Sequence, residues 1–551
     1  MKNIKKKSQI NLIWDIDDLP IKFPSKIRDT YEKIYLKNRR NYTNWIDKIG
    51  KKYANNIDWW MTLPSFRNPY ESKILNYLCI MDTLSILKFT KITLFTSSKI
   101  FGKLITKNFK NSYIEVKIKP KNSGIFTLKN FLKSTIYQLF LFLFIKIFKK
   151  KETFENRKIV LIDKFITFKE KQNLGYFPEF SNSKNIKIVP TFIPTLNIFN
   201  LIKIFNYIKK NPHKYIYKEQ YLNIKDLYFS FSHIFRRRQF LKNKYHYKKI
   251  DLSEMIYNEL KRYDDFYSIN VGLLNYKFFY RLSKERVNVH KSFNWFENQI
   301  IDKGWNYGFR KYFPKNQLNS YGYQDFNKHF NLLSNSPSKL EKSCKVIPNN
   351  IIIISKFFKK ITNEFNKNQK LIIGQSQRFK KLNKIKVIPF KEKKKILIIL
   401  SGIKAIDKEL INMAIKTCKI SKKTQIYIKP HPILNIGNII SKNLLPINIV
   451  LYDGDLKKIL MNSLITITAG PSSALLESVS FGSFNILPKI ECGTLYNAQI
   501  FNLKKNEYSL VNNSRELNNK INYILKNKNK IKVKKKSIIN SKSVKITNLL
   551  Y

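Results

Sequence analysis

Ile426–Pro432, which reads IYIKPHP, and Leu464–Gly482, which reads LITITAGPSSALLESVSFG, decide the fold. Each opens with an apolar, β-branched run of strand length and then meets residues that break a strand. In the second stretch a helical pattern follows the break at once. A strand that passes through a turn into a helix is the repeating unit of a parallel sheet covered by helices. The two stretches therefore predict an α/β fold in which both breaks lie at one edge of a sheet.

A similar alternation of short strands and helical patterns runs through the rest of the chain. Because 551 residues exceed what one ordinary core holds, two domains are expected. A polar break at Ser334–Ser338 (SNSPS) separates two alternating series. The predicted strands are Lys91–Thr96, Tyr113–Ile118, Lys158–Asp163 and Asn185–Thr191 before the break, and Ile351–Ser355, Leu371–Gly374, Lys395–Leu400, Thr424–Lys429, Asn448–Tyr452 and Leu464–Thr468 after it.

The expected architecture is α/β, with two Rossmann-like, doubly wound domains that face a cleft. We place the boundary within 335–350, which gives an N-terminal domain of residues 1–340 and a C-terminal domain of residues 341–530. Residues 531–551 are expected to form a basic tail. In open α/β sheets, ligands bind outside the carboxyl ends of the strands, so the ligand should lie between the domains.

The first candidate site lies at the end of the strand in IYIKPHP. Two prolines stiffen the turn and leave Lys429 and His431 at the carboxyl edge of the sheet. A lysine and an imidazole fixed there can contact a phosphate and stabilise its charge as it leaves. The plainer alternative is a turn histidine that contacts only solvent.

The second candidate site is the break in LITITAGPSSALLESVSFG. Gly470 permits a tight approach, and Ser472 is the expected N-cap of the following helix. Free N–H groups at the helix start, together with the hydroxyls of Ser472 and Ser473, would form an anion site. Glu477 falls about one turn further on, on the face that could reach a ribose hydroxyl. An ordinary capped helix is the alternative.

In this order and spacing, Lys429–Pro432 (KPHP) followed by Ser472–Gly482 resembles the HP and SS motifs of GT-B-type bacterial glycosyltransferases. That group includes capsule polysialyltransferases, Kdo transferases of capsule export and, more distantly, teichoic-acid glycerophosphotransferases. The resemblance implies a GT-B-like fold. It also implies that His431, Ser472 and Ser473 hold the phosphate of a CMP- or CDP-linked donor.

A wider resemblance covers most of the chain. Its motifs are similar to those of a family of surface-carbohydrate biosynthesis proteins. This resemblance implies the pathway in which the chain acts, but not its substrate. The stretches that carry it are Asp58–Trp60 (DWW), Asn294–Gln299 (NWFENQ), Asp302–Arg310 (DKGWNYGFR), Tyr321–Gln324 (YGYQ) and Gly374–Phe379 (GQSQRF).

Glu297 is the candidate general base. It ends an apolar-aromatic run and is expected to face the cleft, where a carboxylate can take the proton of an acceptor hydroxyl. It could equally pair with Arg310 or hold the turn at Gly304. Polysialyltransferases carry an acidic-acidic-glycine motif for this role, and the N-terminal half shows no clear copy. The identity of the base therefore stays open, with Glu297 and His431 as the predicted catalytic residues.

The chain is strongly basic, with 104 Lys and Arg against 37 Asp and Glu and a formal net charge of +67. Such an excess favours anionic partners: nucleic acid, an anionic membrane face or phosphorylated substrates. The basic residues are spread along the whole chain, which argues against a nucleic acid partner. A compositional bias toward lysine, isoleucine and asparagine would produce the same charge, so charge alone identifies no function.

No metal or resident cofactor is expected. Four cysteines, Cys79, Cys344, Cys418 and Cys492, stand far apart, match no metal or redox spacing and suit a reducing compartment. The chain has no Walker loop, no GxGxxG fingerprint and no His/Cys cluster. Its start is basic but lacks the apolar run of a secretory signal, so a cytoplasmic location is expected.

An almost wholly apolar segment lies near 131–150. Its core, Ile136–Phe148, is followed by Lys149–Lys151 and is shorter than the ~20 residues that a bilayer span needs. One interpretation is a helix in the interface of the anionic inner membrane face, anchored by the lysines. The other is a buried core helix of the N-terminal domain.

Together these observations predict an inverting, metal-independent glycosyltransferase of surface polysaccharide biosynthesis (capsule or lipopolysaccharide), peripheral to the inner face of the plasma membrane. The C-terminal domain would bind a nucleotide-sugar donor, with CMP as the expected nucleotide. The N-terminal domain would bind a glycan or lipid-linked acceptor. Two alternatives stay open: a CDP-polyol phosphotransferase of the teichoic-acid type, and a non-catalytic basic protein that binds membrane or nucleic acid.

Overall fold

The computed structural model describes residues 11–16, 25–87, 91–110, 114–120, 124–149, 151–154, 157–166, 185–192, 214–261, 266–379, 387–421, 424–432, 434–441, 444–470, 472–539 and 543–550, together with residues 199, 202, 203, 206 and 382. Lys150 and Pro471, both within predicted features, lie outside the described residues.

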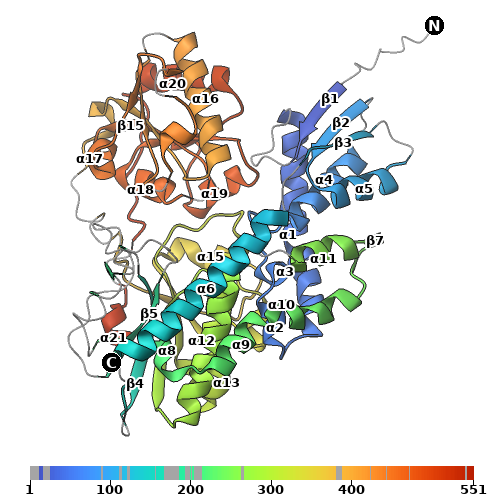
Figure 1. Ribbon diagram of the computed structural model, residues 1–551. Coiled ribbons are helices and arrows are strands. Elements are labelled where there is room, and N and C mark those ends of the chain that lie inside the picture. Colours follow the sequence, from blue (N-terminus) through green and yellow to red (C-terminus); the bar gives the residue numbers. More distant parts are fainter. Residues whose placement is uncertain are drawn as a thin grey trace.

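Parallel strands form the framework (Figure 1). The first sheet has three strands in the order β1-β2-β3, the second has six in the order β11-β10-β9-β8-β4-β5, and the third has six in the order β14-β13-β12-β15-β16-β17. A short antiparallel pair, β6 and β7, stands apart. The strands are β1 Asn11–Asp15, β2 Lys91–Thr96, β3 Ile114–Ile118, β4 Ile159–Ile166, β5 Ile186–Phe192, β6 His246–Tyr247, β7 Ile250–Asp251, β8 Val289–Trp295, β9 Ser320–Gln324, β10 Asn350–Ile353, β11 Lys370–Ile373, β12 Lys395–Ile399, β13 Ile426–Lys429, β14 Ile449–Leu451, β15 Ser463–Thr468, β16 Phe484–Pro488 and β17 Tyr508–Val511.

Helices connect and cover these strands, as parallel pairing requires. They are α1 Ser25–Lys51, α2 Ile57–Trp60, α3 Leu63–Phe66, α4 Ile74–Ile86, α5 Lys99–Asn108, α6 Gly124–Phe148, α8 Lys218–Tyr221, α9 Ile224–Phe231, α10 His233–Arg236, α11 Ser253–Lys261, α12 Phe266–Lys284, α13 Ile300–Tyr312, α14 Lys339–Ser343, α15 Lys359–Thr362, α16 Lys404–Ile420, α17 Leu456–Met461, α18 Ala474–Phe481, α19 Thr494–Ile500, α20 Ser514–Asn527 and α21 Ile546–Leu550.

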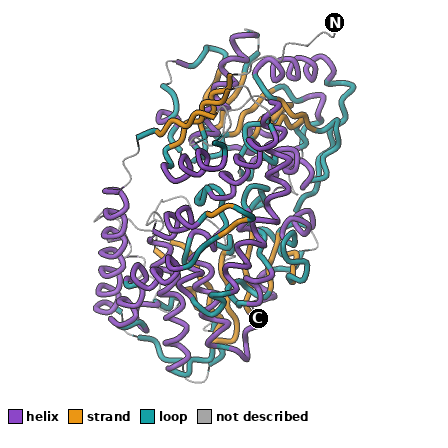
Figure 2. The backbone as a smooth tube through the Cα atoms, turned by 90° about the vertical axis from the view of Figure 1, so that its right-hand side faces the viewer, coloured by secondary structure: helices purple, strands orange, loops and turns teal. Residues whose placement is uncertain are grey.

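Burial explains why the central strands are so apolar. Strands of a parallel sheet are covered on both faces, so they lose the polar–apolar alternation of a half-exposed strand. Every residue of β5, β15 and β16 is buried. The predicted fold class is confirmed: two doubly wound parallel sheets belong to two α/β units, and Figure 2 shows these units one above the other.

The change from the second to the third sheet falls later than the sequence predicted. β10 and β11, expected in the C-terminal domain, pair with β9 and extend the second sheet. The link to the third sheet therefore lies between Ile373 and Lys395, not within 335–350. Strand patterns of equal strength occur on both sides of the polar break, so local sequence does not reveal which sheet a strand joins.

The chain end and the chain start also differ from expectation. The predicted basic tail returns to the second sheet, where Val544 bridges Gly374 and the Ser355 hydroxyl donates to the Ile538 carbonyl. The predicted strands β2 and β3 pair with each other and with β1 in a sheet of their own. Long-range pairing of this kind is set by packing rather than by local propensity.

The apolar segment forms most of α6, which lies on α12 and α8 and crosses the face of the second unit (Figure 1). One side of the helix is buried and the other is exposed. The buried side packs as the core-helix interpretation expected, and the interpretation of a helix in the membrane interface stays a prediction for the exposed side.

Candidate functional site

The predicted phosphate and base residues line one cavity between the second and third sheets. We call this cavity of about 400 Å³ the switch-point cleft. Glu297, Asn327 and Arg378 line it from the side of the second sheet, and Ser401 lines it from the third. The predicted residues in its wall are Glu297, Lys429, His431, Ser472, Ser473 and Glu477. Gly470 lies just behind this wall and lines a small adjoining cavity of about 20 Å³.

The cleft lies where strand order dictates a binding site. In the third sheet the chain builds β12, β13 and β14 in one direction and then returns to place β15 on the other side of β12. This order is that of the Rossmann fold, in which the crevice opens between the first and fourth strands. In the second sheet the corresponding switch lies between β4 and β8, and Glu297 follows β8 by two residues. Both sheets thus direct their switch points at one cavity.

The loop after β12 forms the floor beneath the imidazole. Asp407 of α16 accepts hydrogen bonds from the Ser401 N–H (2.6 Å), the Ser401 hydroxyl (2.8 Å) and the Gly402 N–H (2.9 Å). Gly402 has φ +85°, and a Cβ there would lie 2.7 Å from Nδ1 of His431. Only glycine combines this backbone conformation with so close an approach. The His431 ring is therefore seated on a loop that Asp407 fixes.

The loop after β15 touches the same floor. Gly470 has φ +80°, and a Cβ there would lie 2.9 Å from the Cβ of Ser401. The loops that carry His431 and Ser472 thus meet through Ser401 and Gly402. The two motifs, distant in sequence, are close neighbours at the edge of one sheet, as predicted.

The start of α18 differs by one residue from the prediction. The N-cap position is Ser473, whose side chain makes no capping bond, whereas the Ser472 hydroxyl accepts the Ala474 N–H at 3.2 Å. Both serines are half-buried and line the cleft. The helix start therefore presents two hydroxyls to a ligand, and its partial positive charge favours an anion.

The surroundings of His431 lower its pKa and so favour the neutral imidazole. Burial lowers its pKa, the Asp407 carboxylate opposes this shift, and the Arg378 guanidinium adds to it. A neutral ring offers one N–H donor and one acceptor rather than a full charge. Positive charge in the cleft comes instead from Arg378 and Lys429.

Lys429 closes the wall next to His431. Its ammonium donates to the Asp453 carbonyl at 3.0 Å and lies 5.7 Å from the centre of the Tyr452 ring. These two contacts hold the ammonium at the rim of the cleft, where its positive charge attracts an anion. The predicted contact between Lys429 and a phosphate stays a prediction.

Arg378 also lines the cleft, and sequence reasoning did not single it out. It follows β11 in the GQSQRF stretch and enters the cleft from the second sheet. Asp325 holds this loop by accepting the Gln377 and Arg378 N–H groups at 2.8 and 2.9 Å and the Ser376 hydroxyl. The exposed guanidinium lies close enough to lower the pKa of both His431 and Glu477. The signal in the sequence was an arginine soon after the end of a strand. Which cavity this arginine lines depends on how the two domains pack, and local sequence does not show that.

Glu477 has an unusual protonation behaviour. Burial raises its pKa to about 7, against the lowering influence of Arg378 and Lys457. It lies one turn into α18 and lines the cleft, as the sequence predicted. A carboxyl that titrates near neutral pH can accept a hydrogen bond from a sugar hydroxyl when ionised.

Glu297 sits on a constrained turn between β8 and α13. Its carboxylate accepts the Trp295 indole N–H and the Gln299 amide N–H, both at 2.8 Å. Asn298 has φ +57°, and Asp302 accepts the backbone N–H groups of Glu297 (3.0 Å) and Gln299 (2.9 Å). The predicted alternative of an Arg310 pair is wrong, because Arg310 donates to the Ile347 carbonyl at 2.8 Å. The turn leaves a positioned carboxylate in the wall of the cleft.

Direct contacts hold the two units around the cleft. The Asn327 amide N–H donates to the Ser472 carbonyl at 2.9 Å, which ties the loop after β9 to the loop after β15. Behind it, Glu491 accepts from Tyr70 (2.6 Å) and lies 3.1 Å from the His329 ring. Partners from two segments that precede the third sheet thus surround a carboxylate of the third-sheet unit.

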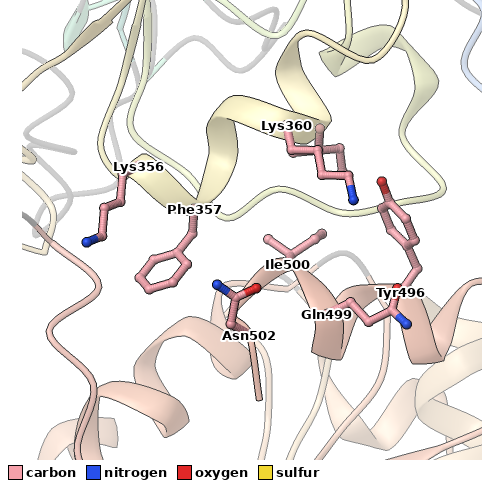
Figure 3. Close-up of a pocket in the computed structure, with 8 residues that line it drawn as sticks. Lys356, Phe357, Lys360, Tyr496, Gln499, Ile500 and Asn502 are labelled. Carbon is pink, nitrogen blue, oxygen red and sulfur yellow. The ribbon is translucent and has the colours of Figure 1, made fainter. Parts of the chain in front are cut away.

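A second cavity of about 480 Å³ lies elsewhere between the same units (Figure 3). We call it the helix cavity, because α15, α19 and the short 3₁₀ helix η4 (Lys356–Phe358) supply most of its wall. Its lining consists of Lys356, Phe357, Lys360, Ile361, Tyr496, Gln499, Ile500 and Asn502. Within the described residues, no group of three or more His, Cys, Asp or Glu side chains could hold a metal ion.

No protein-family model matches the chain, and no curated protein matches it. Among solved structures, the chain is similar to the calicheamicin glycosyltransferase CalG4 (9% identity, 67% of this chain, 90% of that chain, TM-score 0.33). It is also similar to Acinetobacter baumannii MurG (10% identity, 68% and 92%, TM-score 0.34) and to TarM (15% identity, 68% and 93%, TM-score 0.34). Similarity at these identities and TM-scores does not identify a function.

Proposed function

We propose that this protein transfers a sugar from a nucleotide-activated donor to an acceptor hydroxyl in the switch-point cleft. The observation that carries the proposal is the pairing of two chemistries in one cavity. Phosphate-binding groups come from the third sheet, and a positioned carboxylate comes from the second. A cavity with a few convergent polar groups and groups of shifted pKa is the usual form of an active site.

In the proposed complex, the donor phosphate lies against the loops after β13 and β15. The N–H of His431 and the hydroxyls of Ser472 and Ser473 donate to its oxygens, and the Arg378 guanidinium neutralises its charge. One turn further along α18, the Glu477 carboxylate accepts a hydrogen bond from a ribose hydroxyl. These groups bind the donor and hold its leaving phosphate ready before the bond breaks.

Transfer then proceeds by displacement at the anomeric carbon. The Glu297 carboxylate takes the proton of the acceptor hydroxyl, whose oxygen forms the new C–O bond. The old C–O bond to the phosphate breaks, and its electron pair leaves with the nucleotide toward His431 and Arg378. Because the base and the phosphate site lie on opposite walls, the configuration at the anomeric carbon inverts. Closure of the two units excludes water, which would otherwise hydrolyse the donor.

The finer assignment follows from the motif resemblance. We infer CMP as the nucleotide and surface polysaccharide, capsule or lipopolysaccharide, as the product class. The KPHP and SS motifs support a cytidine nucleotide, and the NWFENQ and GQSQRF stretches support the pathway. GQSQRF contains Arg378 and NWFENQ contains Glu297, so both stretches reach the cleft.

Product analysis tests this proposal. A donor labelled with ¹⁸O in the bond between sugar and phosphate is incubated with the enzyme and an acceptor glycan. Sugar transfer breaks the C–O bond and leaves the label on the released nucleotide. A CDP-polyol phosphotransferase would instead break the P–O bond that joins the two phosphates of a CDP-polyol, so that CMP leaves and polyol phosphate enters the product. That result would replace the glycosyltransferase assignment.

A further inference from the structure

The exposed side of α6 is an apolar surface that the transfer reaction does not use. We define it as the α6 outer face, made of side chains spaced by four, three, four and four residues, which is one side of a helix. They are Leu132, Ile136, Leu139, Leu143 and Ile147, with exposed fractions of 48, 58, 37, 49 and 73%. Figures 1 and 2 both show α6 at the surface of the molecule. An apolar face this long marks an interaction surface.

The opposite side of α6 is fixed to the protein. Tyr137, Leu141 and Ile145 are at most 2% exposed and pack with residues of β4 and β5. Ser134 accepts the Asn270 amide of α12 at 3.2 Å. These contacts set the direction in which the outer face points.

The helix lies on a surface rather than crossing a bilayer. Among the described residues, only Lys129–Phe148 is apolar and long enough to span a membrane, and 33% of its apolar window is buried in the protein. Crossing would require the buried side to leave β4 and β5. It would also break the hydrogen bond from Lys146 to the Gln220 carbonyl at 2.9 Å. A helix held along one side can only lie flat, with its outer face in the interface.

Charge identifies the partner. No Asp or Glu occurs from Gly124 to Lys151, and the exposed lysines Lys129, Lys133 and Lys146 border the outer face. A symmetric contact between two copies would place these lysines against each other without an acid to compensate. An anionic bilayer offers acyl chains to the apolar side chains and negative headgroups to the lysines.

We propose that the α6 outer face docks this protein on an anionic phospholipid bilayer. The leucine and isoleucine side chains enter the boundary between headgroups and acyl chains, and the bordering lysines contact the phosphates. The inference does not depend on the transfer reaction. It would place the second-sheet unit, which carries Glu297, on the membrane side, where a lipid-linked acceptor would be found.

Vesicle flotation tests the proposal without any measurement of turnover. The full chain is mixed with vesicles made of equal parts of phosphatidylglycerol and phosphatidylcholine, and separately with pure phosphatidylcholine. We expect flotation with the anionic vesicles, weaker flotation at high salt, and little with the neutral ones. The variant Ile136→Glu/Leu143→Glu should bind at least about 10-fold more weakly. Circular dichroism checks that the variant is folded.

A matched control comes from the third-sheet unit. Leu444 and Ile447 are 68 and 101% exposed, so Leu444→Glu/Ile447→Glu makes the same chemical change away from α6. It should float like the wild type. Lys129→Gln/Lys133→Gln should reduce binding by about 5-fold for each lysine and flatten the salt dependence.

Three results would overturn the proposal. The wild type could fail to bind anionic vesicles, or the control pair could lose as much binding as the α6 pair. Size-exclusion chromatography could also show a wild-type dimer that Ile136→Glu/Leu143→Glu dissociates, which would assign the face to a second copy of the chain.

Discussion

The switch-point cleft and the helix cavity lie between the same two units, and the helix cavity is slightly the larger, at about 480 against 400 Å³. They differ in what forms their walls. The cleft is lined by loops at strand ends, with Gly402 and Gly470 at positive φ and Asp407 and Asp325 fixing the backbone. The helix cavity is lined by side chains of short helices, including the exposed Lys356 and Lys360 (Figure 3).

Cavity volume alone therefore does not identify the candidate active site. Catalytic groups must be held within a fraction of an ångström, which rigid strand ends can do and flexible lysines cannot. The cleft also contains groups whose pKa values are shifted by burial, His431 downward and Glu477 upward. The eight residues that line the helix cavity include no His, Asp or Glu. Among them, burial raises the pKa of the Tyr496 hydroxyl.

The largest effect should come from removing the imidazole. His431→Ala should lower kcat by about 10²–10³, the usual loss for one preorganised donor to a developing charge. Gly402→Ala should approach this effect, because its Cβ would lie 2.7 Å from the ring. Gly437→Ala, in the same unit, is the control, since a Cβ there meets only Asn435, at 3.4 Å or more. Steady-state kinetics on a labelled donor measure all three, and full activity of His431→Ala would remove the motif from the mechanism.

A smaller effect should follow from replacing Arg378, the cation that lines the cleft from the side of the second sheet. Arg378→Gln should raise KM for the donor by about 10-fold, because a hydrogen bond to a charged group is lost. The substitution should also raise the pKa of His431, because the Arg378 guanidinium lowers that pKa in the wild type. NMR titration of the imidazole measures that shift, which a purely structural role of Arg378 would not produce. Lys356→Gln, in the helix cavity, should change neither quantity.

The sequence revealed the parts of this cleft that follow from local pattern. A strand that ends in KPHP and a strand that ends in AGPSS both place their polar residues at the carboxyl edge of a parallel sheet, and His431 and Ser472 lie there. Glu297 was found because it ends an apolar run at β8. These placements need only secondary structure and the direction of the strands.

The parts that sequence reasoning missed depend on tertiary contacts. Gly402 stands out only once His431 is seen against it, and Arg378 is aimed by Asp325, more than 50 residues earlier in the chain. The late domain boundary has the same cause, because β10 and β11 look no different from strands of the third sheet until they pair with β9. The extra sheet formed by β1, β2 and β3 likewise could not be read from local patterns.

Replacing Glu477 should have a modest effect on the free energy of unfolding, because its buried carboxyl destabilises the fold when it is ionised. Its pKa is raised to about 7 from an ordinary 4.5, so the folded state holds the proton more tightly than the unfolded state. The contribution of Glu477 to the stability of the wild type should therefore fall as the pH rises from about 4.5 to 7. Glu477→Gln should be about 1–3 kcal/mol more stable than the wild type at pH 8 and equal to it near pH 4. Urea unfolding at both pH values measures this, and a variant less stable at pH 8 would contradict it.

The smallest effect, none at all, is expected from chelation. The proposed phosphate site uses Arg378, His431 and the start of α18 in place of a divalent ion. EDTA should leave turnover unchanged in the labelled-donor assay. Lost activity that magnesium restores would require a metal in the mechanism.

The most direct test of the central claim, that the switch-point cleft binds the donor phosphate, is a nucleotide titration by thermal shift with CMP, CDP, UDP and GDP. A bound nucleotide raises stability in proportion to ln(1 + [L]/Kd), so the preferred base should stand out. We predict that a cytidine nucleotide stabilises the wild type and the Lys356→Gln/Lys360→Gln variant equally, and that His431→Ala loses most of this shift. A shift that survives in His431→Ala and disappears in the lysine variant would contradict the account and assign the donor to the helix cavity.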